Sequence, residues 1–286
     1  MLTCFEDGAA FESLDQRAFT VGHSLLGHPA LSLENLGQVI PSLSKDQVFH
    51  STGQLEKTDN FDRAHLDRKN GLSIAETIER IRTSDSYVMV RQPETDPSFK
   101  DLYRQLVDDV STLMVRRGVG RAPVDPMLYL FIASPHSVTP FHVDRYSTLL
   151  LQFRGTKQVT VFPMFDERVV TAPELEAFMA RTGERPVYRP DAEALGSTFD
   201  FAPGQALHIP FMAGHHVKNG ADDVSVSLSI IFNTRQTDAL SHAMRLNHRA
   251  RRLGLTPTPV GRGGWRDQGK ALIHRSVSRA RRALAR

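Results

Sequence analysis

The amino-acid sequence predicts a mainly β fold, an antiparallel barrel or jelly roll with flanking helices. The main observation is a series of short β-rich runs in the second half of the chain, separated by turn residues such as Gly155, Pro163 and Gly204. These runs are Met127–Ala133, Thr148–Arg154, Lys157–Phe162, Ala206–Pro210 and Val224–Phe232. Closely spaced strands of this kind favour an antiparallel barrel over alternating βαβ units.

Length and composition exclude several other classes of protein. The chain has 286 residues, of which 40% are hydrophobic and 23% charged, as in an ordinary globular protein. Its single cysteine, Cys4, forms no internal disulfide. We find no apolar run of the ~18–20 residues that a membrane span needs, and the first residues are acidic rather than signal-like. We therefore expect a cytoplasmic protein without a transmembrane segment.

The charge is unevenly distributed along the chain. Residues 241–286 contain 12 lysine and arginine residues against one acidic residue, a net charge of +11, while the remainder carries −8. Such a tail favours docking on the acidic body or on a second copy of the chain. An anionic partner is the alternative, but nucleic acid is not expected because no helix-turn-helix or zinc finger is evident.

Helical patterns occur on both sides of the β-rich region. Residues 1–84 indicate a mixed helical and loop segment, with helices at Glu34–Val39 and Ser73–Thr83, the second opened by a Ser73/Glu76 capping box. Tyr87–Val90 is a short β run. Next comes a helix over Pro97–Arg117, whose apolar face is formed by Leu102, Leu106, Val110 and Leu113.

The basic tail predicts two more helices, Ala239–Leu253 and Lys270–Arg286. The second carries an apolar stripe that we expect to dock, with a homodimer through these helices as one outcome: Ile273, Val277, Ala280 and Leu284. Its arginines would then face the acidic body or a partner subunit: Arg275, Arg279, Arg281, Arg282 and Arg286. The predicted organisation is an N-terminal segment 1–84, a β core 85–235 and a helical extension 236–286.

The segment from Ser134 to Pro163 contains the residues that point to chemistry. On an extended segment His142 and Asp144 point the same way and can bind one metal ion together. A third ligand must come from a distant strand, and the candidates are His208, His215 and His216. Two imidazoles and one carboxylate leave open positions that suit Fe(II) and O₂. The alternative is that these histidines are ordinary core or surface residues.

A wider pattern resembles a known family. Thr139-Pro-Phe-His-Val-Asp144, Leu-Leu-Gln-Phe-Arg-Gly-Thr-Lys at 150–157, Gly204-Gln-Ala-Leu-His-Ile-Pro, His215-His-Val-Lys-Asn and Ser225-Val-Ser-Leu-Ser occur in that order. Over roughly residues 70–235 the chain resembles the bacterial cupin-like branch of the JmjC-type Fe(II)/2-oxoglutarate oxygenases. The resemblance implies a double-stranded β-helix, the cupin-like form of the jelly roll.

The resemblance also assigns roles to individual residues. His142, Asp144 and His215 match the metal ligands of the family, so His216 would point away from the metal and His208 would either support the site from behind or be a packing residue. Lys157 matches the lysine that binds the distal carboxylate of 2-oxoglutarate, and Thr139 the hydroxyl beside it. Three further residues are expected to line the pocket: Tyr87, Thr148 and Ser229.

Physical arguments support part of this assignment. A lysine inside an apolar strand is costly to bury without an anion, and a dianionic co-substrate needs a fixed cation. The alternative for Lys157 is a solvent-facing hairpin position. Ser225, Ser227 and Ser229 alternate with apolar residues, as expected for a strand that lines a cavity or for one that exposes its serines.

The resemblance implies a dioxygenase that uses Fe(II), 2-oxoglutarate and O₂. It would hydroxylate a C–H bond of a protein or peptide side chain, or of a small metabolite, and release succinate and CO₂. Zinc deaminase and zinc hydrolase chemistry are disfavoured because the PCxxC and HExxH motifs are missing. The alternative is a non-catalytic, metal-binding sensor or interaction module.

Overall fold

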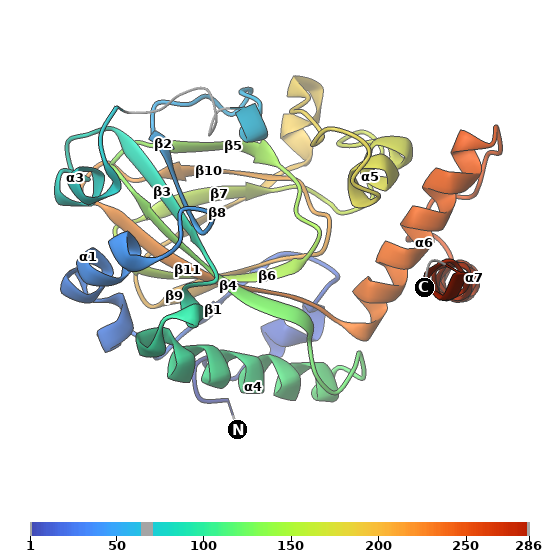
Figure 1. The fold of residues 1–286 in the computed structure, drawn as a ribbon, viewed down its shortest axis with the longest axis horizontal. Coiled ribbons are helices and arrows are strands. Elements are labelled where there is room, and N and C mark those ends of the chain that lie inside the picture. Colours follow the sequence, from blue (N-terminus) through green and yellow to red (C-terminus); the bar gives the residue numbers. More distant parts are fainter. Residues whose placement is uncertain (1, 64–70, 285–286) are drawn as a thin grey trace.

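The computed structural model describes residues 2–63 and 71–284, which form two antiparallel sheets packed face to face (Figure 1). The larger sheet has the strand order β1-β9-β6-β11-β4-β3-β2, and the smaller one β5-β10-β7-β8. Neighbouring strands are antiparallel, which confirms the predicted jelly roll. The strands are β1 (Phe19–Gly22), β2 (Val48–Thr52), β3 (Ser86–Arg91), β4 (Val124–Ala133), β5 (Val138–His142), β6 (Ser147–Arg154), β7 (Lys157–Val161), β8 (Ser197–Phe201), β9 (Gln205–Ile209), β10 (His215–Asn219) and β11 (Ser225–Asn233).

The five predicted β-rich runs correspond to β4, β6, β7, β9 and β11, and the run at Tyr87 corresponds to β3. The helix-and-loop expectation for residues 1–84 is wrong in part, because β1 and β2 lie there and form the two edges of the larger sheet. Both are short and only partly buried, so their sequences show no strong alternation. The division of the chain at residues 84 and 235 stays a prediction.

Helices flank the sheets and overlap the predicted ranges, although several ends differ by four to six residues and α5 was not predicted. The capping box of α3 is present: Ser73 Oγ accepts from the Glu76 amide, and the Glu76 carboxylate accepts from the Ser73 amide. The helices are α1 (Leu33–Ser42), α3 (Ile74–Glu79), α4 (Lys100–Arg116), α5 (Ala172–Met179), α6 (Arg235–Arg252) and α7 (Gly264–Leu284).

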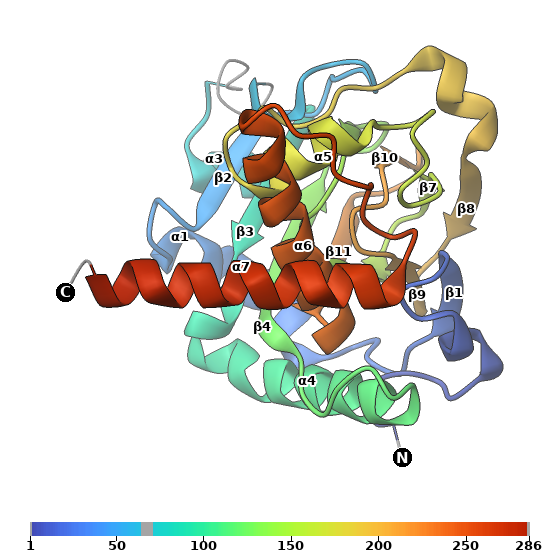
Figure 2. The same cartoon turned by 90° about the vertical axis from the view of Figure 1, so that its right-hand side faces the viewer.

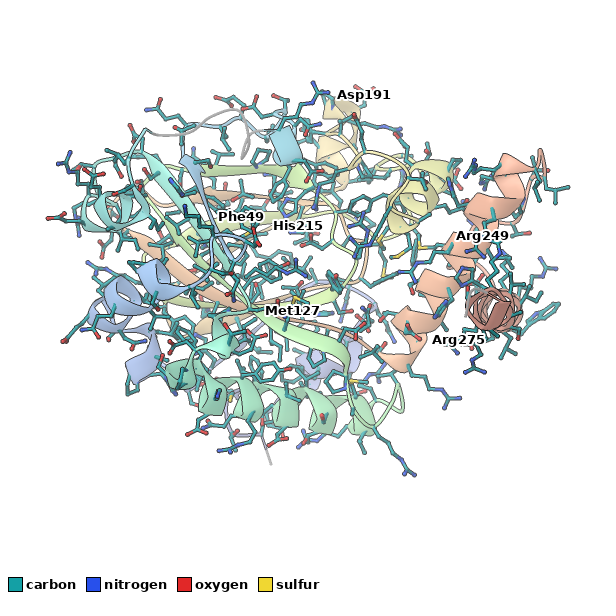
Figure 3. All side chains as sticks on the ribbon, in the orientation of Figure 1. Phe49, Met127, Asp191, His215, Arg249 and Arg275 are labelled. Carbon is teal, nitrogen blue, oxygen red and sulfur yellow. The ribbon has the colours of Figure 1, made fainter. Side chains whose placement is uncertain are left out.

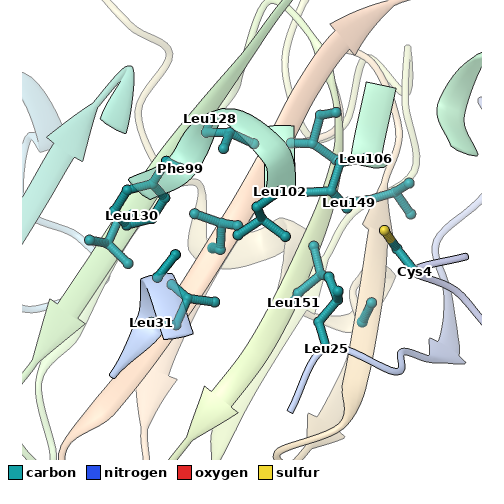
Figure 4. Close-up of a cluster of buried hydrophobic side chains, with 14 of the residues drawn as sticks. Cys4, Leu25, Leu31, Phe99, Leu102, Leu106, Leu128, Leu130, Leu149 and Leu151 are labelled. Carbon is teal, nitrogen blue, oxygen red and sulfur yellow. The ribbon is translucent and has the colours of Figure 1, made fainter. Parts of the chain in front are cut away.

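The main apolar core lies between α4 and the outer face of the larger sheet. Leu102 and Leu106 of α4 face alternate leucines of β4 and β6, namely Leu128, Leu130, Leu149 and Leu151 (Figure 4). All of them are essentially fully buried, and each contributes about 1.5–3 kcal/mol by leaving water. Because strand side chains alternate, the other face of the same strands points into the space between the sheets.

The C-terminal helix packs differently from the prediction. α7 begins at Gly264, not Lys270, and lies across α6 on the outside of the molecule (Figure 2). Its buried face carries Asp267, Ala271 and His274. The predicted stripe points to solvent instead: the side chains of Ile273 and Val277 are 55% and 39% exposed, and Ala280 is exposed. The side chain of Leu284 lies outside the described residues.

Polar contacts explain why this face of α7 is the one that docks. The Nδ1 atoms of His274 and His242 of α6 are 2.8 Å apart, and Arg275 pairs with Asp238 of α6 at 2.5 Å. Arg275 thus contacts an acidic residue of the body, as expected, whereas Arg279 and Arg281 are exposed, and a partner subunit facing them stays a prediction. The side chain of Arg282 and all of Arg286 lie outside the described residues. Within residues 2–63 and 71–284, no helix has the length and apolarity of a membrane span.

Candidate active site

Strand pairing brings the two predicted metal-binding segments together. His142 is the last residue of β5 and His215 the first of β10, and the antiparallel register of these neighbours pairs the two histidines directly. Their ring centroids are 4.1 Å apart. Figure 3 shows His215 between the two sheets. Asp144 follows β5 on the same face as His142, as the period-two spacing predicted.

Three ligand atoms converge at this point. Asp144 Oδ2 lies 3.9 Å from His142 Nε2 and 3.8 Å from His215 Nε2. These atoms all lie within 4.8 Å of one another, close enough to bind a single ion. The structure therefore brings together His142, Asp144 and His215, the three residues that the sequence selected.

Hydrogen bonds fix the orientation of both imidazoles. His142 Nδ1 lies 2.8 Å from the Pro140 carbonyl oxygen, and His215 Nδ1 lies 3.1 Å from that of Ala213. Because a carbonyl oxygen only accepts, each Nδ1 carries the proton and each Nε2 presents a lone pair. Burial lowers the pKa of both histidines, which keeps them neutral and able to bind a metal.

Asp144 is held in its ionised form. Desolvation in the cavity raises its pKa, but the positive charges of the imidazoles, when protonated, and of Arg185 outweigh this effect, and the net pKa is lowered. The site therefore offers one carboxylate and two neutral imidazoles, the donor set that non-haem Fe(II) sites use.

The other two candidate histidines lie elsewhere. His216 points to the opposite side of β10, where its Nε2 is 3.7 Å from Glu193 Oε2. His208 is fully buried on β9, accepts a hydrogen bond from the Asp15 amide and donates to the Thr148 carbonyl oxygen. It packs against Phe19 and does not line the cavity, in keeping with the expectation that it packs against the site or supports it from behind.

A cavity of about 150 Å³ between the sheets contains the predicted site residues. The three candidate metal ligands lie on its wall together with Lys157, Thr139, Tyr87, Thr148 and Ser229. The assignments by sequence thus meet in one place, although they come from β3, β5, β6, β7, β10 and β11.

Lys157 is buried in this cavity without a counter-charge. Lys157 is the first residue of β7 and is only 6% exposed, so the alternative that it faces solvent is wrong. Burial alone lowers its pKa from 10.5 to about 7, and no acidic side chain of the described residues pairs with it. An ammonium in this position is costly, and an anionic ligand would offset its desolvation.

Further polar side chains line the cavity. The hydroxyls of Tyr87 and Thr139 are hydrogen-bonded to each other, and burial raises the pKa of Tyr87. Thr148 Oγ1 is buried and has no hydrogen-bond partner among the described residues. Ser229 is also buried, as is every residue of β11, so the alternative of an exposed serine face is wrong.

The sequence analysis missed the aromatic wall and one arginine. Tyr129 and Phe131 of β4 line the cavity, and their alternation with Leu128 and Leu130 could have revealed this face. The cavity is also lined by Phe61, Tyr146 and Arg185. Phe61 and Arg185 lie outside the sheets, where no strand periodicity marks the residues that face a site.

The double-sheet barrel, with a two-histidine, one-carboxylate group on adjacent strands, defines a cupin-type protein. The chain belongs to the cupin-like domain family, whose sequence profile matches residues 33–238. Among curated proteins, none is significantly similar in sequence to this chain.

Solved structures of YcfD from Escherichia coli are similar in fold. An X-ray structure of this protein matches with a TM-score of 0.53 and 12% identity, over 92% of this chain and 63% of that chain. A structure described as that of a ribosomal oxygenase gives a TM-score of 0.49, 13% identity, and 92% and 61% coverage. A structure of the same protein in complex with cobalt and 2-oxoglutarate gives a TM-score of 0.46 and 13% identity, over 87% of this chain and 57% of that chain. The chain spans about three fifths of the length of these proteins, and the likeness to the first of them shows the fold.

Proposed function

We propose that the chain is an Fe(II)- and 2-oxoglutarate-dependent dioxygenase. It would hydroxylate a C–H bond of a protein or peptide side chain, or of a small metabolite, and release succinate and CO₂. The observation that carries this proposal is one cavity that holds both a converging His142/Asp144/His215 group and a buried lysine, Lys157, with no acidic partner among the described residues.

The three converging residues fit Fe(II). Two neutral imidazoles and a carboxylate on one side of an octahedral ion leave three positions for other ligands. Bound Fe(II) supplies the site of O₂ activation, and 2-oxoglutarate supplies the electrons for it. The chain contributes the fixed orientation: the Pro140 and Ala213 carbonyls hold the rings so that each Nε2 points to the shared position.

The polar end of the cavity fits the distal carboxylate of 2-oxoglutarate. Lys157 offers the cation, and Thr139, held by Tyr87, offers a hydroxyl beside it. Thr148, whose hydroxyl has no partner in the described chain, also lines the cavity, at the end of β6 that lies away from Lys157. Ser229 lines the same wall. A carboxylate bound beside Lys157 would offset the buried charge of its ammonium.

The remaining walls are apolar and exclude water from the reacting centre. Leu150, Ile209 and Val217 line the cavity from three strands, and the aromatic residues of β4 close another side. Exclusion of water strengthens each charge interaction in the pocket.

The cytoplasmic setting and the expectation of no nucleic-acid partner stay predictions.

The proposal is tested by co-substrate turnover. Protein loaded anaerobically with Fe(II) and 2-oxoglutarate is exposed to O₂, and succinate is quantified. We expect the wild type to form succinate slowly without a prime substrate, and His215→Ala to form none. His216→Ala is the matched control because this neighbour points away from the site, and it should retain iron and turnover.

Two results would count against the proposal. Stoichiometric iron binding without any succinate, with peptide and metabolite mixtures included, would favour the alternative of a metal-binding sensor or interaction module. Loss of iron in His216→Ala together with its retention in His215→Ala would refute the ligand assignment.

We also propose that a second copy of the chain covers the outer face of α7, which would form the expected homodimer. This face exposes four large apolar side chains: Trp265, Leu272, Ile273 and Val277. Full burial of a side chain of this size contributes about 1.5–3 kcal/mol, so pairing two such faces would remove a substantial apolar surface from water. The two-fold symmetry of most homodimers suits one helix face that packs on its own copy.

A further inference from the structure

Arg185 contacts the carboxylate of Asp144 on the side away from the two histidines. We infer that Arg185 is a positioning residue, which holds one oxygen of Asp144 so that only the other faces the metal position. This inference rests on the proposed metal site and concerns how many positions that site leaves open.

The two oxygens of Asp144 have different neighbours. Oδ1 lies 3.2 Å from Arg185 Nη1, whereas Oδ2 lies 3.9 and 3.8 Å from the two imidazole Nε2 atoms. The same Nη1 donates to the Val143 carbonyl oxygen at 2.7 Å. One nitrogen therefore links the backbone just before Asp144 to its side chain, which opposes rotation of the carboxylate.

Arg185 is itself held in place. Its Nε lies 3.1 Å from Asp62 Oδ1, and its guanidinium lies over the rings of Phe61 at 4.6 Å and Phe178 at 5.1 Å. Phe61 in turn stacks on His142, with centroids 4.3 Å apart and an interplanar angle of 22°. The side chain is only 16% exposed. A planar guanidinium held on several sides is well suited to fix a carboxylate.

The consequence for the site concerns coordination. A carboxylate that is free to rotate can bind an octahedral ion through both oxygens, which would take a second of its six positions. With Oδ1 held by Arg185, Asp144 offers Oδ2 alone, and three positions stay open for co-substrate and O₂. Groups that orient metal ligands in this way typically change metal affinity by 10–100-fold when removed.

Co(II) binding tests this role without turnover. Arg185→Met keeps an apolar chain beside Phe61 and Phe178 but removes the donor to Asp144. Loss of a positive charge near the site would by itself tighten binding of a divalent cation. A positioning role predicts the opposite: the Co(II) affinity of Arg185→Met, measured by calorimetry, should be at least about tenfold lower than that of the wild type. Its visible Co(II) spectrum should also change, because the coordination is altered.

Arg145→Met is the matched control. Arg145 lies over the same Phe178 ring at 3.6 Å and donates to the Phe178 carbonyl oxygen, without a hydrogen bond to Asp144. The Arg145→Met variant should bind Co(II) at least as tightly as the wild type and should give the same visible Co(II) spectrum. If Arg185→Met does not fold, Arg185→Lys replaces it, because a single amine cannot reproduce the contacts to both Asp144 and Asp62.

The outcomes are distinguishable. An Arg185 variant that binds Co(II) as tightly as the wild type, with an unchanged spectrum, would overturn the positioning role and leave the proposed function standing. A wild-type protein that binds no Co(II) would instead overturn the metal site on which the proposed function rests.

Discussion

Replacing Lys157 with methionine should have opposite effects on the free protein and on co-substrate binding. In the free protein the variant removes a buried ammonium that has no acidic partner among the described residues. In the complex it removes the cation that we assign to the distal carboxylate of 2-oxoglutarate. The free variant should therefore be more stable than the wild type, and its affinity for 2-oxoglutarate should be lower.

The pKa of Lys157 gives the size of the first effect. A shift from 10.5 to about 7 corresponds to roughly 4–5 kcal/mol for holding the charged amine in the folded protein. Between these values the unfolded chain binds more protons, so wild-type stability rises with pH. The gain from Lys157→Met should thus be largest below about pH 7 and should shrink as the pH rises towards 10.5.

The second effect follows from the lost ion pair. A charge-assisted hydrogen bond contributes ~1.5–3 kcal/mol, so affinity should fall roughly ten- to a hundredfold. Because only the ammonium binds a carboxylate strongly, wild-type affinity should weaken by about tenfold per pH unit above about 7, until the roughly ten- to hundredfold contribution of the ion pair is lost. The variant should lack this pH dependence.

Anaerobic calorimetry on Co(II)-loaded protein between pH 6 and 9 measures the affinity, and thermal unfolding of the metal-free protein measures the stability. Lys218→Met is the matched control, since Lys218 is an exposed lysine on the neighbouring strand β10. Equal 2-oxoglutarate affinity and equal pH profiles for wild type and Lys157→Met would refute the assignment of Lys157.

Two further predictions concern α7. Leu272→Asp on its exposed face should shift the sedimentation mass from dimer to monomer, whereas Val115→Asp, an exposed apolar position on α4, should not. Acidification should loosen α7, because burial lowers the pKa of His274 from 6.5 to about 4, helped by the cationic neighbours Arg249, Arg245 and Arg281 and by His242. Neutral His274 thus contributes stability that is present above pH 6.5 and is lost as the pH falls towards 4. The hydrogen-exchange rate of α7, corrected for intrinsic exchange, should therefore rise as the pH falls over this range. In His274→Leu the corrected rate should be nearly independent of pH.

Sequence periodicity predicted those parts of the fold in which one face of an element is fully buried. Leu102, Leu106, Val110 and Leu113 recur at helical spacing and all lie in the core, so α4 was predicted with nearly correct ends. β1 and β2 are short edge strands with few buried residues. Their place in the sheet depends on pairing with distant strands, which local sequence does not encode.

The site was predictable where its residues lie on strands at fixed spacing. His142 and Asp144 are two residues apart, and the resemblance supplied His215 on the partner strand. Arg185 comes from the irregular segment after α5 and reaches Asp144 only through the tertiary fold. No spacing in the sequence links these two residues, so the structure was needed to reveal their contact.

The orientation of α7 shows a limit of amphipathic patterns. Periodicity correctly predicted a helix with one apolar face, but the side that docks depends on what the neighbouring element offers. α6 presents His242 and Asp238, which are satisfied by His274 and Arg275 of α7. Burying these polar groups without partners would cost more than leaving Ile273 and Val277 in water. The polar face therefore packs inside the chain, and the apolar face is left for the second copy that we propose.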